Sequence, residues 1–211
     1  MKLLTNNSSA IQHLKNVDDR LAKVIQTIGP ISISLYSDGF SFLVHEIIEQ
    51  MLSKRSGAII YSRLQNLCDH QITPYSISIL SEADLYSVGI SRRKASYIKS
   101  LAEDVISSKI DLTLLPSMSD IDATKYLLNL HGVGSWTAKM YLIFVLGRED
   151  ILPYEDGAFI QVFRWLYSTE DVSQSNIDSI CKKWSPYSSI AARYFYKALD
   201  SGLTKQNMST Y

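Results

Sequence analysis

Apolar residues recur at helical spacing through most of this 211-residue chain. Between residues 40 and 52, for example, Leu43, Ile47, Ile48 and Met51 lie three or four positions apart, which places them on one face of a helix. Serine or aspartate, the residues that cap helix N-termini, precedes many of the helical stretches. Helices are predicted over 18–28, 40–52, 58–67, 81–86, 91–107, 119–130, 135–147, 157–167, 175–183 and 189–199. The sequence therefore predicts an all-α protein.

One segment departs from the helical pattern. Apolar and polar residues alternate over Ile31–Leu35, as they do in a strand. The rest of the sequence offers no obvious strand partner, so we expect an extended connector here.

Composition limits the class of protein. Hydrophobic residues make up 46% and charged residues 20% of the chain, as is typical of a globular protein. Cys68 and Cys181 are the only cysteines and lie far apart, which excludes a four-cysteine zinc site or iron–sulfur cluster. The start of the chain lacks the apolar run of a secretion signal, and no run reaches membrane-spanning length. We expect a cytoplasmic protein that does not contact membranes.

Charge alone does not favour nucleic acid as a partner. The formal net charge is zero, whereas nucleic-acid-binding domains are usually basic. The charges are unevenly distributed, however. Residues 51–100 contain seven lysines and arginines but three acidic residues. A basic face and an ordinary solvated surface both remain open.

The segment Leu130–Lys139, with the sequence L-H-G-V-G-S-W-T-A-K, is the most informative part of the chain. One predicted helix ends there, two glycines bracket a valine, and another helix begins. Glycine at 132 and 134 permits backbone angles closed to other residues and removes side chains that would hold a ligand away, and we expect Val133 to point inward. Exposed N–H groups at a helix N-terminus bind anions, so a DNA phosphate fits this turn. The predicted contact residues are Gly132, Val133, Gly134, Ser135, Thr137 and Lys139.

Two motifs carry a family resemblance. The pattern L-x-G-V-G-x-W-T-A, beginning at Leu130, resembles the helix–hairpin–helix motif of DNA glycosylases. Residues 147–156 resemble that family's G-R-x-D-x-x-P-x-x-D signature, whose final aspartate falls on Asp156. The resemblance implies two helical lobes with a DNA-binding cleft between them. We expect one lobe over about 36–115, and a second over 1–35 plus 116–211 that carries the hairpin and Asp156.

The resemblance implies a chemical role for Asp156. Cleavage of an N-glycosidic bond builds positive charge on the sugar, and a carboxylate stabilises that charge and orients the attacking water. From position alone, Asp156 is an N-cap of the helix that begins near Gly157, and the two roles are compatible. Glu155 aligns less well with the signature, and Asp150 matches its first, structural acid.

Trp136 narrows the type of glycosylase. In relatives that also cut the DNA backbone, a lysine at this position forms a Schiff base. Lys139 lies one turn further along, so the resemblance implies a monofunctional N-glycosylase without an AP-lyase lysine. Tryptophan before Thr-Ala resembles the 3-methyladenine DNA glycosylase II (alkylpurine) branch, in which aromatic rings attract cationic alkylated purines. The predicted base pocket contains Trp136, Tyr154 and Tyr196, with core packing as the other interpretation.

A third resemblance predicts the residues that fill the gap left by a flipped base. Residues 47–53 resemble the family's I-I-x-Q-x-x-S segment, which places Met51 at the position of the inserted wedge and Leu52 as the second choice. Ile90, in a segment resembling L-x-x-L-G-x-S-x-x-K-A, is expected to press on the opposite strand. Met51 also suits the apolar face of its helix.

The chain departs from the family at Glu49, His131 and Ser188, where glycine, proline and arginine are usual. We also expect no counterpart of the extra N-terminal domain of the bacterial enzyme. These departures put the substrate range in doubt more than the fold.

Three functions follow from these observations. The first is base excision repair of double-stranded DNA by hydrolytic removal of 3-methyladenine or 7-methylguanine. The others are a non-catalytic binder of bulged, branched or abasic DNA, and a glycosylase for another purine lesion. We expect a monomer without an obligate protein partner or cofactor. A Na⁺ or K⁺ ion on the backbone carbonyls of Leu130 and Val133 is the one possibility left open.

Overall fold

The computed structural model describes residues 2–206, which form two compact, mainly helical units. Unit 2 is one continuous stretch, Tyr36–Leu146. Unit 1 combines the two ends of the chain, Met1–Leu35 and Gly147–Tyr211. The all-α fold class predicted from the sequence is confirmed.

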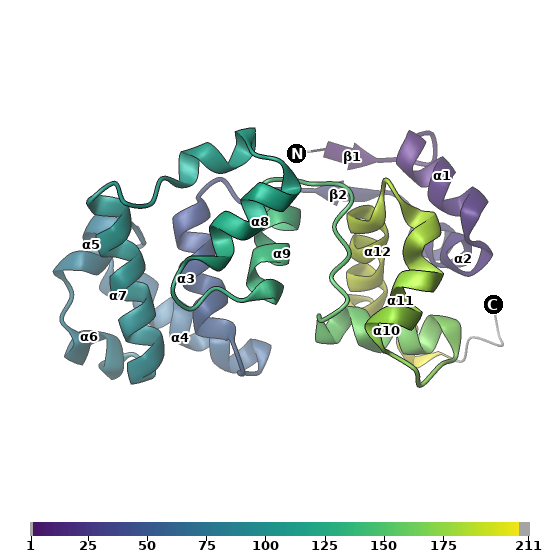
Figure 1. Cartoon of the computed structure of the whole chain (residues 1–211). Helices are drawn as coiled ribbons and strands as arrows, with labels where there is room; N and C mark the ends of the chain where they lie inside the picture. Colours follow the sequence, from purple (N-terminus) through teal and green to yellow (C-terminus); the bar gives the residue numbers. More distant parts are fainter. Residues whose placement is uncertain (1, 207–211) are drawn as a thin grey trace. The chain divides into compact units, whose positions relative to one another are not determined.

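Unit 2 is built around α3 (Gly39–Glu49), whose buried residues lie on nearly every side of the helix. Helices α4, α7 and α9 pack against it (Figure 1). Asp38 caps α3, with its carboxylate accepting from the backbone N–H groups of Phe40 and Ser41. The remaining elements are α4 (Lys54–Leu67), α5 (Pro74–Ile79), α6 (Glu82–Ser87), α7 (Arg92–Ile106), the 3₁₀ helix Leu112–Ser117, α8 (Asp120–Leu128) and α9 (Ser135–Phe144).

Unit 1 buries an aromatic core, in which Phe159 packs against Phe163, Trp184 and Phe195. Helices α10 and α12 pack against each other, and α2 packs on both (Figure 1). The elements are β1 (Lys2–Leu4), α1 (Ser9–Val17), α2 (Asp19–Ile28), β2 (Ile31–Ile33), α10 (Gly157–Tyr167), α11 (Gln174–Cys181) and α12 (Ser188–Asp200), with 3₁₀ helices at Lys182–Trp184 and Leu203–Lys205.

A buried carboxylate joins the elements of unit 1. Asp18 is only 2% exposed. One oxygen accepts from the N–H groups of Arg20 and Leu21 at the start of α2, and the other from Tyr167 and Trp184. Burial acts to raise the pKa of Asp18, but these hydrogen bonds and the one from the ammonium of Lys183 outweigh it and leave the pKa lowered.

The structure corrects two expectations about chain organisation. The alternating segment at 31–33 has a partner after all, because β2 pairs antiparallel with β1 in the register Leu4↔Ile31 and Leu3↔Ser32. The second boundary between the units falls at 146/147 and not near 115. Helix α8 packs on α9, and α9 packs on α3, so residues 116–146 belong to unit 2. The hairpin and Asp156 are therefore in different units.

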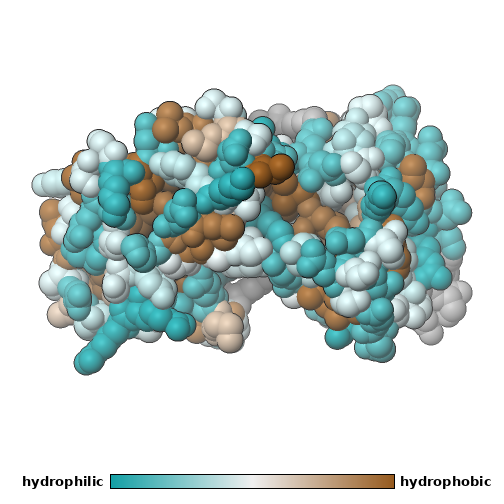
Figure 2. All heavy atoms as spheres, in the orientation of Figure 1, coloured by the Kyte–Doolittle hydropathy of each residue, from teal (hydrophilic) through white to brown (hydrophobic). Residues whose placement is uncertain are grey.

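The surface is mixed. Figure 2 shows hydrophilic atoms over much of the visible face, interrupted by smaller apolar patches. Several large apolar side chains are exposed, and Met51 is the most exposed of them at 96%. Within residues 2–206, none of the helices combines the length and apolar character needed to span a bilayer.

Candidate nucleic-acid interface and active site

The turn between α8 and α9 requires glycine at its first position. Gly132 has φ +81°, and a Cβ built there would lie 2.5 Å from Cδ2 of Tyr97. A side chain is thus excluded both by backbone conformation and by the neighbouring ring. Val133 is 7% exposed and donates its N–H to the carbonyl of Leu130 at 3.1 Å, so it points inward as predicted.

Gly134 fits the second expected reason for a glycine, the absence of a side chain, and not the first. Its φ is −97°, which any residue can adopt, so the expectation of a restricted backbone is corrected here. A Cβ at this position would meet nothing within 4 Å, and Gly134 provides no side-chain cap to α9. The absence of a side chain leaves room for an anion at the first turn of the helix, where the dipole favours negative charge.

The predicted hairpin contacts divide by exposure. Ser135 is exposed, and Trp136 and Lys139 are half-buried. Thr137 is 1% exposed and its hydroxyl lies 3.4 Å from the side-chain nitrogen of Gln50. This burial argues against the Thr137 hydroxyl as a DNA contact, whereas contact through its backbone N–H, in the first turn of α9, stays a prediction.

The loop after α3 presents Met51 in an unfavourable conformation. Its φ is +58°, in the left-handed region, where a non-glycine residue costs roughly 1–2 kcal/mol. The side chain is 96% exposed and gains nothing from burial, whereas the neighbouring Leu52 is 40% exposed. Met51 is therefore not a core residue, and its role as the wedge stays a prediction.

Ile90 is not available for the role expected of it. Its side chain is 3% exposed and belongs to the core of unit 2. Its N–H bonds to the carbonyl of Leu85, which closes the turn after α6. The expectation that Ile90 presses on a DNA strand is corrected accordingly.

Asp156 is the N-cap of α10. One carboxylate oxygen accepts from the N–H of Phe159 at 2.8 Å, and the Asp156 N–H bonds to the carbonyl of Pro153. Because Phe159 is fully buried, the cap anchors this half-buried carboxylate to the core of unit 1. This bond fixes the position of the Asp156 carboxylate. A fixed position is expected both for a helix cap and for a catalytic acid.

The segment leading to Asp156 is fastened to the start of α12. The Asp150 carboxylate accepts from the Ser185 hydroxyl at 2.6 Å and from both the N–H and the hydroxyl of Ser188. Ser189 donates its N–H to the Glu149 carbonyl. Burial acts to raise the pKa of Asp150, but the bonds from the serines leave it lowered. The departure at Ser188 is thus accommodated, since its hydroxyl binds the structural acid of the signature.

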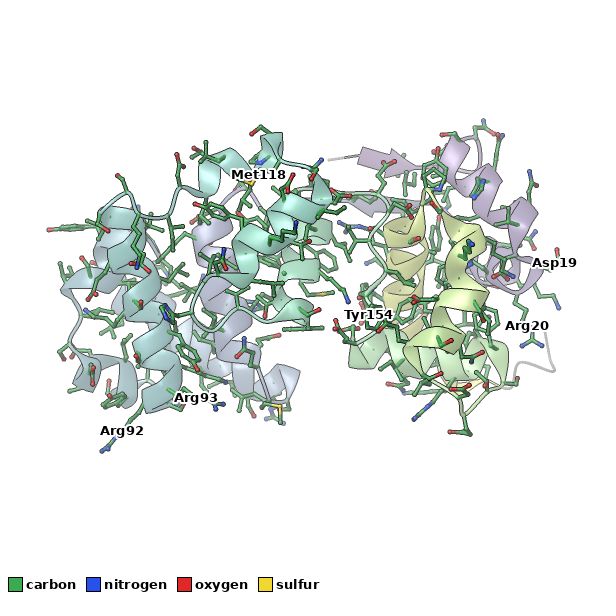
Figure 3. All side chains as sticks on the ribbon, in the orientation of Figure 1. Asp19, Arg20, Arg92, Arg93, Met118 and Tyr154 are labelled. Atoms are coloured by element: carbon green, nitrogen blue, oxygen red, sulfur yellow. The ribbon has the colours of Figure 1, made fainter. Side chains whose placement is uncertain are left out.

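The three predicted pocket aromatics lie in two units. Tyr154, on the segment before α10 (Figure 3), and Tyr196, on α12, both pack against the core of unit 1. Trp136 belongs to unit 2. Tyr154 and Tyr196 are each partly exposed, so packing accounts for part of each ring. Their role in binding a base stays a prediction.

Sequence reasoning missed two residues beside the hairpin. The side-chain nitrogen of Gln50 donates to the Gly132 carbonyl at 2.8 Å. The Lys94 ammonium donates to the carbonyls of Ile48 and Gln50. Both residues lie in segments that carry the family resemblance, so their positions in those motifs were the available signal.

The predicted cation stays a prediction. The Leu130 carbonyl accepts from the Val133 N–H and retains a second lone pair, which is compatible with an additional ligand. The Gly132 carbonyl between them already accepts from Gln50. Side chains do not supply an alternative, because the described part of the chain contains no group of three or more His, Cys, Asp or Glu residues arranged to hold a metal.

The fold and these sites together define a class of protein. It is all-α, its α8–α9 hairpin turns at Gly132 and has room for an anion at Gly134, and its Asp156 carboxylate caps the start of a helix. Residues 44–186 match the family described as HhH-GPD superfamily base excision DNA repair protein. The chain belongs to this family.

Several relatives resemble the chain over nearly its whole length. The alkylbase DNA glycosidase-like protein mag2 of Schizosaccharomyces pombe is 26% identical over 89% of this chain and 92% of its own. A crystal structure of DNA-3-methyladenine glycosidase from Bacillus halodurans is 28% identical, with a TM-score of 0.85 over 99% of this chain and 96% of that one. The S. pombe 3-methyladenine DNA glycosylase Mag1, in complex with abasic DNA, has a TM-score of 0.84 at 24% identity, over 92% and 97% of the two chains, and shows a shared fold.

Proposed function

We propose that the protein is a monofunctional DNA N-glycosylase that removes alkylated purines from double-stranded DNA. The observation that carries the proposal is Asp156, the acid of the family signature, held by a 2.8 Å bond at the N-terminus of α10. The family match and relatives named as 3-methyladenine glycosylases and glycosidases support it.

The reaction is a hydrolysis. The bond between the sugar C1′ and the purine nitrogen breaks, and its electron pair leaves with the base. The positive charge left on the sugar is stabilised by the Asp156 carboxylate, which also orients water for attack on C1′. The cationic alkylated purine leaves as a neutral base, and the proton lost by the water passes to the Asp156 carboxylate and then to solvent. Because Trp136 stands where backbone-cutting relatives carry lysine, no Schiff base forms, and the product is an abasic site.

DNA engagement uses the two exposed features of unit 2. The open start of α9 at Gly134 and Ser135 binds a backbone phosphate, which positions the duplex without reading its sequence. Met51 enters the stack in place of the flipped nucleotide, with Leu52 beside it. The exposure of both side chains supports this assignment.

The substrate class follows from the chemistry of alkylated purines. N3- and N7-alkylation gives the base a positive charge, which makes it a better leaving group and attracts it to electron-rich rings. Trp136, Tyr154 and Tyr196 provide such rings. We also propose a cytoplasmic enzyme, associated with the nucleoid through DNA and acting as a monomer without a cofactor.

The test is release of bases from methylated DNA, measured by chromatography. Wild type is expected to release 3-methyladenine or 7-methylguanine, and Asp156→Asn to lose about 10²–10⁴-fold in rate while still folding, because asparagine also caps helices. Glu155→Gln, at the exposed neighbouring position, is the matched control and is expected to retain the rate.

Wild-type rates in Asp156→Asn would refute the catalytic assignment. A folded wild type that binds DNA but releases no base would refute the proposed substrate. Binding of bulged or branched DNA without release from any lesion would instead favour a non-catalytic DNA binder.

A further inference from the structure

The loop that carries Met51 is held by contacts from elsewhere in unit 2. Met51 has φ +58° and a 96% exposed side chain, so neither backbone preference nor burial keeps it in place. Unfavourable conformations of this kind persist only where the surroundings determine them. The question is which side chains do so.

Lys94, near the start of α7, makes the most direct contacts. Its ammonium donates to the carbonyl of Ile48 at 2.7 Å and to that of Gln50 at 2.6 Å. The Gln50 carbonyl belongs to the peptide group that immediately precedes Met51. Fixing the direction of that carbonyl fixes the peptide plane from which the φ angle of Met51 is measured. Lys94 therefore acts on the backbone conformation of Met51 without touching its side chain.

Gln50 connects the same loop to the hairpin. Its side-chain nitrogen donates to the Gly132 carbonyl at 2.8 Å, and the Thr137 hydroxyl lies at 3.4 Å. Gly132 is itself fixed by its φ of +81° and by the ring of Tyr97. A single residue thus joins the peptide before Met51 to the turn that precedes α9.

We propose that Lys94 is a positioning residue which, with Gln50, fixes the inserting side chain of Met51 relative to the phosphate-binding hairpin. Lys94 acts on DNA through Met51 and binds no phosphate itself. The inference rests on the proposed function, because it takes Met51 as the wedge. It explains why a half-buried lysine directs its charge at two carbonyls of unit 2. Burial and the neighbouring Arg93 lower the pKa of Lys94, as expected of an ammonium removed from solvent.

The main variant is Lys94→Met, which keeps the aliphatic stem and removes the donor. The chain offers a matched control in Lys99 on the same helix, whose ammonium donates to the carbonyls of Ser78 at 2.8 Å and Leu80 at 2.7 Å, at the end of α5. Lys99→Met removes the same type of interaction at a distance from the Met51 loop. Gln50→Leu is the second variant, should Lys94→Met fail to fold.

Three measurements separate the possible roles. Single-turnover excision at saturating enzyme reports the chemical step after binding. A duplex with 2-aminopurine as the target base reports unstacking by its fluorescence, without any chemistry. The salt dependence of duplex binding counts phosphate contacts, since losing one reduces the slope of log K against log salt by about one.

Lys94→Met and Gln50→Leu are each expected to lower single-turnover excision and the 2-aminopurine signal roughly tenfold, with the salt slope unchanged. Lys99→Met is expected to retain both signals. In a Met51→Ala background, Lys94→Met is expected to cause little further loss, because residues that act through one another are not additive.

The proposal is overturned if Lys94→Met retains wild-type flipping, or if Lys99→Met causes an equal loss. It is also overturned if the salt slope falls by about one, which would make Lys94 a phosphate contact, or if the full tenfold loss persists in Met51→Ala. A wild type that releases no base refutes the proposed function only, because the fluorescence measurement still tests Lys94.

Discussion

The two units present their functional groups by opposite means. In unit 1, carboxylates occupy helix starts: Asp18 at α2, Asp156 at α10 and Asp150 bonded to the first residue of α12. In unit 2, the functional features depend on backbone conformation. They are the start of α9, which has no side-chain cap at Gly134, and Met51, whose backbone is in the left-handed region. Unit 1 holds the Asp156 carboxylate in an ordinary N-cap geometry, whereas unit 2 holds Met51 in an unfavourable backbone conformation.

The difference matches what each unit has to do. A catalytic carboxylate works best when its position is fixed by ordinary, low-energy geometry tied to a core. A side chain that enters a base stack has to project from the surface, and a projecting methionine gains no stability in the free protein. Unit 2 supplies the restraint from Lys94 and Gln50 instead. Removing Asp18 from unit 1 should therefore cost stability, whereas replacing the strained Met51 of unit 2 should cost function.

The largest expected loss of stability comes from Asp18→Ala. The change leaves Tyr167 and Trp184 without their acceptor and removes the cap of α2, so we expect a loss of roughly 3–5 kcal/mol in the free energy of unfolding. Urea unfolding followed by circular dichroism measures it. Asp19→Ala, at the exposed neighbouring position, should change stability by less than about 0.5 kcal/mol. Equal effects for the two would show that Asp18 is not the centre of unit 1.

The two hairpin glycines provide the next test. Gly132→Ala forces a Cβ to 2.5 Å from Tyr97 at φ +81°, and we expect a loss of about 2 kcal/mol in stability together with weaker DNA binding. Gly134→Ala meets no neighbour and should leave stability within about 0.5 kcal/mol while still weakening binding. Thermal unfolding and duplex titration of both variants separate the effects. A stability loss in Gly134→Ala would contradict the open geometry at this position.

Acid and alkali should affect the two units in opposite ways. The folded-state pKa values of Asp18 and Asp150 are lowered below 3.8, so their contribution is complete above that pH and is lost as the pH falls through the lowered values. In unit 2, burial acts to lower the pKa of His45, but the hydrogen bond and charge of Glu46 and the charge of Glu49 raise it above 6.5. The His45 contribution is therefore complete below pH 6.5 and is lost as the pH rises through the raised value.

Urea unfolding between about pH 3 and 8 tests this contrast. Asp18→Asn should flatten the acidic limb only, and His45→Gln the limb near neutrality only. A His45→Gln variant with the wild-type profile above pH 6 would exclude His45 as the source of that limb.

The smallest expected change is a gain. Met51→Gly relieves the left-handed strain and is expected to stabilise the protein by up to about 1 kcal/mol while lowering base excision. Thermal unfolding and single-turnover excision on the same preparation measure both. Met51→Ala, which keeps a Cβ at the strained position, is the control and should lose excision without the gain in stability. A destabilised Met51→Gly would mean that the methionine packs usefully in the free protein.

The sequence predicted most of what depends on local structure. Caps such as Ser91 and Ser119 marked helix starts, and each accepts the expected backbone N–H. One family motif located the hairpin and the other located Asp156, and the inward direction of Val133 was confirmed. Local signals sufficed because a cap and a tight turn are each completed within a few residues.

Apart from the backbone angles of Gly134, the failures concern contacts between distant segments. Helical spacing could not distinguish an exposed Met51 from a buried Ile90, since both are apolar residues at element ends. The partner of β2 is the start of the chain, across two intervening helices. Lysine is usually a surface residue, so nothing in the local sequence directed Lys94 to the carbonyls of a helix that ends 45 residues earlier, at Glu49.

The interrupted course of unit 1 bears on how the protein is made. Unit 2 is one uninterrupted stretch, so its helices leave the ribosome one directly after another. It can fold as soon as Leu146 has emerged. Helices α1 and α2 emerge first, yet the helices that cover Leu21 and Ile25, α10 and α12, come last. At roughly 5–20 residues per second, these apolar faces wait on the order of ten seconds for their partners. During synthesis, unit 1, which carries Asp156, is therefore the unit whose apolar helix faces are exposed to aggregation for longer.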